Sequence, residues 1–403
     1  MKPRTAEAPI DFDPWDYDVQ EDPYPLYARL RDEDPLHHNE RDDFWVLSRH
    51  ADVARAFRSE DVYSNAMGVS LDASAWGPRA HQTMSILAMD PPDQTRMRSL
   101  VSKGFTPRRV RELAPRIQEL TAQYFDEVLE GDLDWIADFA GRLPMDVICE
   151  LMGVPPADRD EVRRLADLLV HREEGLRDVP PAGMEAALTL FGYYADLLAE
   201  HRRNPTDDLT SALLAAEVDG ERLADGEIIA FLFLMVVAGN ETTTKLLGNA
   251  LVHLASHPEQ LADVLADPDL VAPWIEETLR FDPSTQMLAR HLLQDVELHG
   301  KVAPRGSKLV LALGAANRDD RVFSRPDDFD LHRPPAEVAQ LVSFGGGRHF
   351  CLGANLARLE AQIALAELQR RVRGLEVHHD RAVRVHSINV RGYAALPITV
   401  ERR

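Results

Sequence analysis

The chain has 403 residues, 45% of them hydrophobic and 28% charged, so it can bury a large core. Its formal net charge of -22 argues against nucleic acid and anionic membranes as partners. No run approaches the roughly 18 to 20 apolar residues that a membrane helix needs, and the first residues have no apolar signal-peptide core. We therefore expect a soluble, cytoplasmic protein.

The first hundred residues mix short elements with loops. We expect a short helix over 26–31 and a small hairpin of strands 36–39 and 44–47. From 63 to 88 the pattern fails, and a long irregular loop in a compact protein is often functional. The paired prolines at 91 and 92 suit the first turn of a helix that runs through Val101. Gln94 and Arg98 are four residues apart and share a face of this helix.

The middle of the chain, between about 108 and 256, has a helical period almost throughout. Its longest helix is expected over 225–256, with Asp225 as a possible cap. This helix is apolar nearly all round, which predicts that it is buried and crosses the middle of the protein. We expect Gly239 and the threonines after it to interrupt the helix, because glycine costs about 1 kcal/mol there relative to alanine.

The last third alternates helices with short strands. We expect a helix over 275–280, strands over 296–298 and 308–313 with a turn at 304–306, and a loop-rich stretch over 317–333. A final helix follows residue 351, and short strands close the chain near 388–390 and 398–400. With no internal repeat and no linker, the sequence predicts one mainly α domain over 1–403 with a smaller β portion.

The two cysteines differ in setting. Cys149 lies inside an apolar helical pattern, which favours a buried inert thiol. Cys351 follows a glycine run at 345–347 and directly precedes a helical pattern, so it should lie at a helix N-terminus, where free N–H groups stabilise a thiolate. That combination suits an axial ligand to heme iron. A phosphate loop or an ordinary tight turn remains an alternative.

The stretch 344–353 resembles the cysteine-loop signature of the cytochrome P450 family. The positions on the family pattern are Phe344, Gly345, Gly347, His349, Cys351 and Gly353. Further landmarks follow the family order: the acid-alcohol pair at 241–242, Glu277 with Arg280, and the stretch 317–333. The resemblance spans roughly residues 90–403. It implies the cytochrome P450 fold, with heme b held between the long central helix and the cysteine-loop helix.

The resemblance also assigns roles. It makes Cys351 the iron ligand and supplies cations for the heme propionates from Arg98, Arg290 and His349. Many relatives carry histidine where this chain has Gln94, so that contact is in doubt. The cofactor-binding residues implied are Cys351, His349, Arg290, Arg98, Gln94, Phe344, Gly345, Gly353, Ala238 and Gly239. Glu277, Arg280 and Arg333 are expected to form a structural network behind the cysteine loop.

Glu241 and Thr242 match the acid-alcohol pair that delivers protons, and the small Ala238 and Gly239 leave room for O2. The alternative is a threonine bonded to its own helix and a glutamate on a solvated face. An isolated acid is costly to bury in so apolar a helix, which favours a functional role.

The function implied is that of a soluble bacterial-type monooxygenase that inserts one atom of O2 into a lipophilic small molecule such as a steroid, terpene, macrolide or fatty acyl chain. No GxGxxG motif follows a strand, so electrons should come from a separate ferredoxin and its NAD(P)H-dependent reductase. The ferredoxin is expected to dock on Arg96, Arg98, Lys103, Arg108, Arg109 and Arg358, and the protein is expected to be a monomer. The alternatives are a peroxide-driven heme peroxygenase and a non-catalytic heme ligand sensor.

Overall fold

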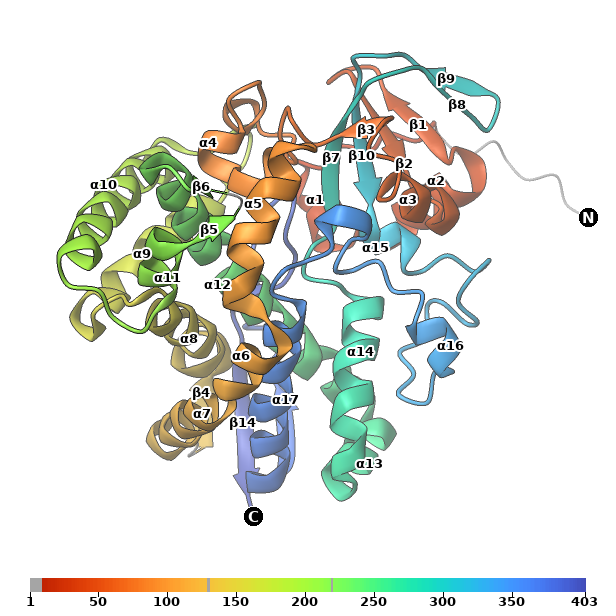
Figure 1. The fold of residues 1–403 in the computed structure, drawn as a ribbon. Coiled ribbons are helices and arrows are strands. Elements are labelled where there is room, and N and C mark those ends of the chain that lie inside the picture. Colours follow the sequence, from red (N-terminus) through yellow and green to blue (C-terminus); the bar gives the residue numbers. More distant parts are fainter. Residues whose placement is uncertain (1–8, 129–130, 219) are drawn as a thin grey trace, which may run out of the picture.

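The structure is a computed structural model that describes residues 9–128, 131–218 and 220–403, without the side chains of Lys103 and Pro107. Helices make up most of it, and a five-stranded sheet lies to one side (Figure 1). The predicted mainly α fold with a smaller β portion is confirmed.

The α-helices are α1 Tyr17–Glu21, α2 Tyr24–Glu33, α3 His50–Ala56, α4 His81–Met84, α5 Asp93–Val101, α6 Pro107–Glu112, α7 Ala114–Val128, α8 Leu143–Met152, α9 Arg159–Val170, α10 Pro181–Arg203, α11 Leu209–Ala215, α12 Asp225–Ala255, α13 Pro258–Ala266, α14 Val271–Phe281, α15 Leu313–Ala316, α16 Pro335–Val338 and α17 Ala354–Arg371. A π-helix covers Trp135–Ala140.

The strands are β1 Leu36–Asn39, β2 Phe44–Leu47, β3 Tyr63–Ser64, β4 Gly131–Asp134, β5 Glu217–Val218, β6 Glu221–Arg222, β7 Met287–Leu292, β8 Val296–Leu298, β9 Lys301–Ala303, β10 Lys308–Ala312, β11 Val372–Val377, β12 Val383–Arg384, β13 Tyr393–Ala395 and β14 Pro397–Arg402.

Helix α12 is the long central helix that the sequence predicts, and it packs against α8, α10, α14 and α17. It is unbroken through Gly239, so the predicted interruption is wrong. Its start also differs from the prediction, because the N–H of Ala224 donates to the Glu227 carboxylate at 2.8 Å, a capping contact that does not use Asp225.

We expected no segment apolar enough to cross a membrane. By length and composition, however, α12 is long and apolar enough to do so, with a mean hydropathy of 1.3 over 18 residues. Half of that window is buried in the protein. Helices α8, α10, α14 and α17 surround it, as expected for the core helix of a folded domain rather than for a helix facing lipid.

The main sheet has the order β1-β2-β10-β7-β3, and only its β2–β10 pair is parallel. Along β10, Leu309 and Leu311 face one apolar cluster while Val310 and Ala312 face another, so both faces of the strand are buried. The register pairs Leu309 with Arg290, which fixes the position of Arg290 in β7.

Several local predictions are confirmed, including the hairpin of β1 and β2 and strand β8. Strands β4, β7 and β9 were not predicted, and the strand expected near 388–390 is wrong, because Val390 there makes a single bridge to Thr285. Strand β4 interrupts the stretch expected to be helical and pairs with β14. A pattern confined to one segment does not reveal a strand whose partner is far along the chain.

Candidate active site

Residues 344–353 form a tight loop just before α17. The N–H of Cys351 donates to the Phe344 carbonyl at 2.9 Å, and Gly345 and Gly347 have φ of +69° and +60°. A Cβ on Gly347 would lie 2.2 Å from the Phe57 carbonyl oxygen. Glycine is therefore required because the loop presses on the end of α3.

The Cys351 side chain faces an internal cavity. Burial raises the pKa of its thiol, and the N–H groups of Gly353 and Ala354, together with Arg98 and Arg358, oppose that rise. Cys351 therefore lies at the start of α17 as predicted, with backbone donors directed at its sulfur. Cys149 is fully buried, and burial raises its pKa to about 12, as expected for an inert thiol.

The cavity lies between the cysteine loop and α12, and most of its wall is apolar. Away from the loop, its apolar lining includes Val69, Ile86, Leu87, Phe231, Leu234, Met235 and Leu288. The irregular segment 63–88 contributes Asn65, Val69, Ile86 and Leu87 to the wall. Gln286 and Asn389 are not among the lining residues described, and their amides donate to the Pro283 carbonyl at 2.8 Å and to Ser70 Oγ at 2.9 Å.

Three basic side chains meet at the edge of this cavity: Arg98 from α5, Arg290 from β7 and His349 from the cysteine loop. Among the described residues, no carboxylate lies at ion-pairing distance from any of them. Burial lowers the pKa of Arg290 to about 10, and burial followed by Arg290 and Arg98 lowers that of His349 to about 3. The cluster is therefore a buried site of positive charge that an anion would stabilise.

Gln94 is buried one turn before Arg98. Its amide donates to the Arg348 carbonyl at 2.9 Å, and Arg98 Nη1 donates to the same oxygen at 3.0 Å. Gln94 is not among the lining residues described. Both side chains thus fasten the cysteine loop to α5, and Arg98 alone of the two reaches the cavity.

The acid-alcohol pair lies in the middle of α12. The Thr242 hydroxyl donates to the Ala238 carbonyl at 2.7 Å, which is the local bond that the alternative interpretation expected. Thr242 nevertheless lines the cavity with Ala238 and Gly239, and its oxygen keeps lone pairs that can accept a hydrogen bond. Glu241 is 3% exposed, so it does not lie on a solvated face.

Gly239 is not required by packing. A Cβ there would meet Ile148 at 3.6 Å, an ordinary contact. Because glycine weakens a helix by about 1 kcal/mol relative to alanine, its presence needs another reason. Gly239 itself lines the cavity, together with Ala238 and Thr242.

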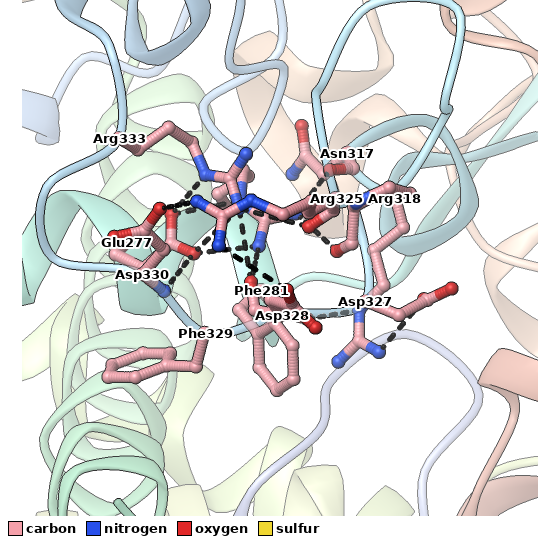
Figure 2. Close-up of polar contacts among 12 residues, drawn as sticks. Glu277, Phe281, Asn317, Arg318, Arg325, Asp327, Asp328, Phe329, Asp330 and Arg333 are labelled. Carbon is pink, nitrogen blue, oxygen red and sulfur yellow. Dashed lines mark hydrogen bonds and ion pairs between the residues drawn. The ribbon is translucent and has the colours of Figure 1, made fainter.

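Behind the loop, Glu277 and Arg280 of α14 form a buried ion pair with Arg333 (Figure 2). The distances from the Glu277 carboxylate are 2.7 Å to Arg280 Nη2 and 3.0 Å to Arg333 Nε. Arg280 also donates to the Asn317 carbonyl at 3.1 Å, and the Asn317 amide bonds Ser343, next to Phe344. The network therefore connects α14 to the first residues of the cysteine loop.

Three polar partners were missed by the sequence analysis. Lys245 Nζ lies 3.1 Å from the Glu241 carboxylate, a pair that the i, i+4 spacing could have suggested. Burial, followed by the nearby Glu241 carboxylate, raises the pKa of Asp167 on α9 to about 7. Arg172 pairs with Asp72 at 2.8 Å, and both side chains are buried. No sequence signal connects Asp167 with Glu241 or Arg172 with Asp72, because α9 and the loop after it are far from these partners in sequence and approach them only in the folded chain.

Comparison with known proteins places this site in a family context. The family model for cytochrome P450 matches residues 184–386. The putative cytochrome P450 123 of Mycobacterium tuberculosis is 56% identical over 405 residues, covering 100% of both chains, and the vitamin D(3) 25-hydroxylase of Pseudonocardia autotrophica is 39% identical over 95% of both. The solved structure of cytochrome P450 CYP109Q5 from Chondromyces apiculatus superposes with a TM-score of 0.87 at 35% identity, covering 98% of this chain and 99% of that one.

Proposed function

The chain belongs to the cytochrome P450 family, and on that premise we propose that this heme b monooxygenase inserts one atom of O2 into a lipophilic small molecule held in the Cys351 cavity. We further propose that residues 1–403 act as one domain and that the protein works as a cytoplasmic monomer. The observation that carries the proposal is a cysteine thiol that faces an apolar cavity beside the His349 imidazole and two guanidinium groups, Arg98 and Arg290, which have no carboxylate at ion-pairing distance among the described residues.

These residues fit heme b. We propose Cys351 as the iron ligand, with Arg98, Arg290 and His349 as partners of the two propionates, because the cluster lacks carboxylate partners in the described structure. The orphaned Nε2 of His349, buried without a hydrogen bond, supports this assignment. Bound heme with a thiolate ligand supplies O2 activation and O–O cleavage.

The remaining cofactor and catalytic assignments rest on position. Phe344, Gly345 and Gly353 line the cavity on the cysteine side, and Ala238 and Gly239 leave space on the opposite side. A Cβ on Gly353 would meet nothing within 4 Å, which suits a residue that faces a bound group. We propose that Thr242 orients a water with its free lone pairs and that Glu241 supplies protons to it. Gln94 is the weakest assignment, because its amide is committed to Arg348.

The substrate is proposed to be a lipophilic molecule of the steroid, terpene, macrolide or fatty acyl type. Apart from Arg98, Arg290 and His349, the described residues that line the cavity carry no charged side chain, which supports this class. A relative at 39% identity is named for hydroxylation of vitamin D(3), which is itself a lipophilic molecule.

The electron donor is proposed to be a ferredoxin with its NAD(P)H-dependent reductase. Of the six basic residues expected at its docking surface, Arg96 pairs with Glu227 and Arg358 with Glu276, and the Lys103 side chain lies outside the described residues. Arg109 is exposed on α6, with no carboxylate at ion-pairing distance among the described residues. We therefore expect Arg109→Glu to slow ferredoxin-dependent reduction about tenfold, while Arg203→Glu on α10 should not.

The reduced CO spectrum tests the cofactor assignment. We expect the strongly red-shifted Soret band of thiolate ligation in the wild-type protein and in Cys149→Ala, and its loss in Cys351→Ala. A retained band in Cys351→Ala would contradict the assignment. Product formation that requires ferredoxin, reductase, NAD(P)H and O2 separates the monooxygenase from a peroxide-driven peroxygenase and from a non-catalytic ligand sensor.

A further inference from the structure

Asn65, in the irregular segment 63–88, is a polar residue in the wall of the Cys351 cavity, and it is 3% exposed. Its Nδ2 donates to the Leu87 carbonyl at 2.8 Å. Because a carbonyl can only accept, this bond fixes which end of the amide is the nitrogen. The nitrogen carries a second hydrogen, which no residue in the described ranges accepts. A buried N–H without an acceptor is costly, so this donor needs a partner.

The backbone places Asn65 beside Arg290. Strands β3 and β7 pair antiparallel, with Ser64 opposite His291. Asn65 follows Ser64 directly, so it lies level with Arg290, and opposite positions of an antiparallel pair present their side chains on one face. Both side chains line the cavity. The spare N–H of Asn65 is therefore next to a guanidinium of the basic cluster.

The position of Asn65 is fixed by a carboxylate behind it. Asp90 accepts hydrogen bonds from the Asn65 N–H at 2.8 Å and from the Ser64 hydroxyl at 2.5 Å. The N–H of Gln94 on α5 donates to the Asp90 carbonyl at 3.0 Å, and the same helix carries Arg98. One residue thus connects Asn65 to the helix of a second cation of the cluster.

A second buried asparagine shows what a purely structural amide does. Asn39 is 4% exposed, its Nδ2 donates to the Phe12 carbonyl at 2.9 Å, and its Oδ1 accepts from the Asp42 N–H at 2.9 Å. Asn39 is not among the described lining residues. Joining residues 65 and 87 explains the Leu87 bond of Asn65, but it does not explain a spare donor in the cavity wall beside Arg290.

We propose that Asn65 is a further heme-binding residue, whose free N–H donates to the propionate that Arg290 holds. The proposal rests on the proposed heme b function. A neutral amide adds a directed hydrogen bond to a carboxylate without adding charge to the buried basic cluster. Asn65 would therefore hold the propionate in one orientation, a task for which a further cation is not required.

Heme release to excess apomyoglobin, followed at the Soret band, tests the contact. Loss of a hydrogen bond to a charged group should make release from Asn65→Ala about tenfold faster. Asn65→Asp keeps the size but turns a carboxylate toward the propionate, so release should be about 100-fold faster. Asn39→Ala and Asn39→Asp lose a backbone contact of the same kind and should release heme at the wild-type rate.

The reduction potential separates heme binding from a structural role. Each Asn65 substitution leaves more uncompensated negative charge near the iron, so the potential should fall from the wild type to Asn65→Ala and further in Asn65→Asp. A structural role alone would lower the Tm of the Asn65 and Asn39 variants and leave release rate and potential unchanged, which would overturn the proposal. If Asn65→Asp yields no folded protein, Asn65→Leu keeps the size without a donor and should match Asn65→Ala.

The outcomes also separate this inference from the proposed function. A wild-type protein that binds no heme contradicts the proposed function itself. Heme binding without product contradicts the monooxygenase activity, while the release rates still report on Asn65. An Asn65→Ala variant that keeps the wild-type release rate but binds substrate more weakly would assign the amide to the substrate and overturn the inference alone.

Discussion

Removing Glu277 should expose how much the cysteine loop depends on the buried ion pairs behind it. Its carboxylate accepts hydrogen bonds from Arg280, Arg333 and the N–H of Asp330, and the two arginines are 0% and 5% exposed. In Glu277→Ala both guanidinium groups lose their shared counterion in the interior, which costs about 3 to 5 kcal/mol. At roughly 2.1 cal/mol/K of unfolding entropy per residue, this corresponds to a Tm about 4 to 6 °C lower.

The chain contains a matched control. Glu161 and Arg164 have the same spacing and the same 2.7 Å distance as Glu277 and Arg280, but their side chains are 57% and 59% exposed. Glu161→Ala should leave the free energy of unfolding almost unchanged, because solvent screens an exposed ion pair. Thermal unfolding followed by circular dichroism compares the two variants, and equal Tm values would refute the reasoning. If Glu277→Ala yields no folded protein, Glu277→Gln keeps the volume and should give a smaller drop in Tm than the one predicted for alanine.

Three further substitutions test other contacts in the structure. Thr242→Ala should bind heme and consume NAD(P)H but release hydrogen peroxide in place of product, measured as product formed per NAD(P)H. Burial alone would raise the pKa of Asp282, but Arg391 holds that pKa well below its usual range. The contribution of the Asp282 carboxylate to the stability of the folded protein is therefore complete above about pH 4 and is lost as the pH falls further. Asp282→Asn should therefore cost more stability to urea at pH 7 than at pH 2. Arg172→Met, which leaves Asp72 buried and unpaired, should cost about 3 kcal/mol and speed proteolysis within 171–180.

Sequence patterns predicted the helices and strands that depend mainly on residues close together in the chain. The hairpin predicted over 36–39 and 44–47 matches β1 and β2 in its bounds, and the apolar run after 225 predicted α12 within one residue of its observed end. Strand β7 was missed because its residues include Arg290 and His291, which argue against a buried strand. It forms because β10 supplies the backbone partners, and that pairing joins segments on either side of the β8–β9 hairpin.

The residues of the candidate site also fall into those that a local pattern reveals and those that it does not. Cys351, Glu241 and Thr242 could be proposed because each belongs to a short motif in which neighbours in sequence share one task. What the motif could not give is the partner of Glu241. In isolation its carboxylate would be a costly buried charge, and the structure resolves this with Lys245, whose ammonium lies 3.1 Å from the Glu241 carboxylate. Lys245 in turn donates to the carbonyl of Tyr393, which lies 148 residues later in the chain. Because the position of the ammonium depends on a segment so distant in sequence, a motif confined to residues 241–242 cannot reveal how the charge of Glu241 is stabilised.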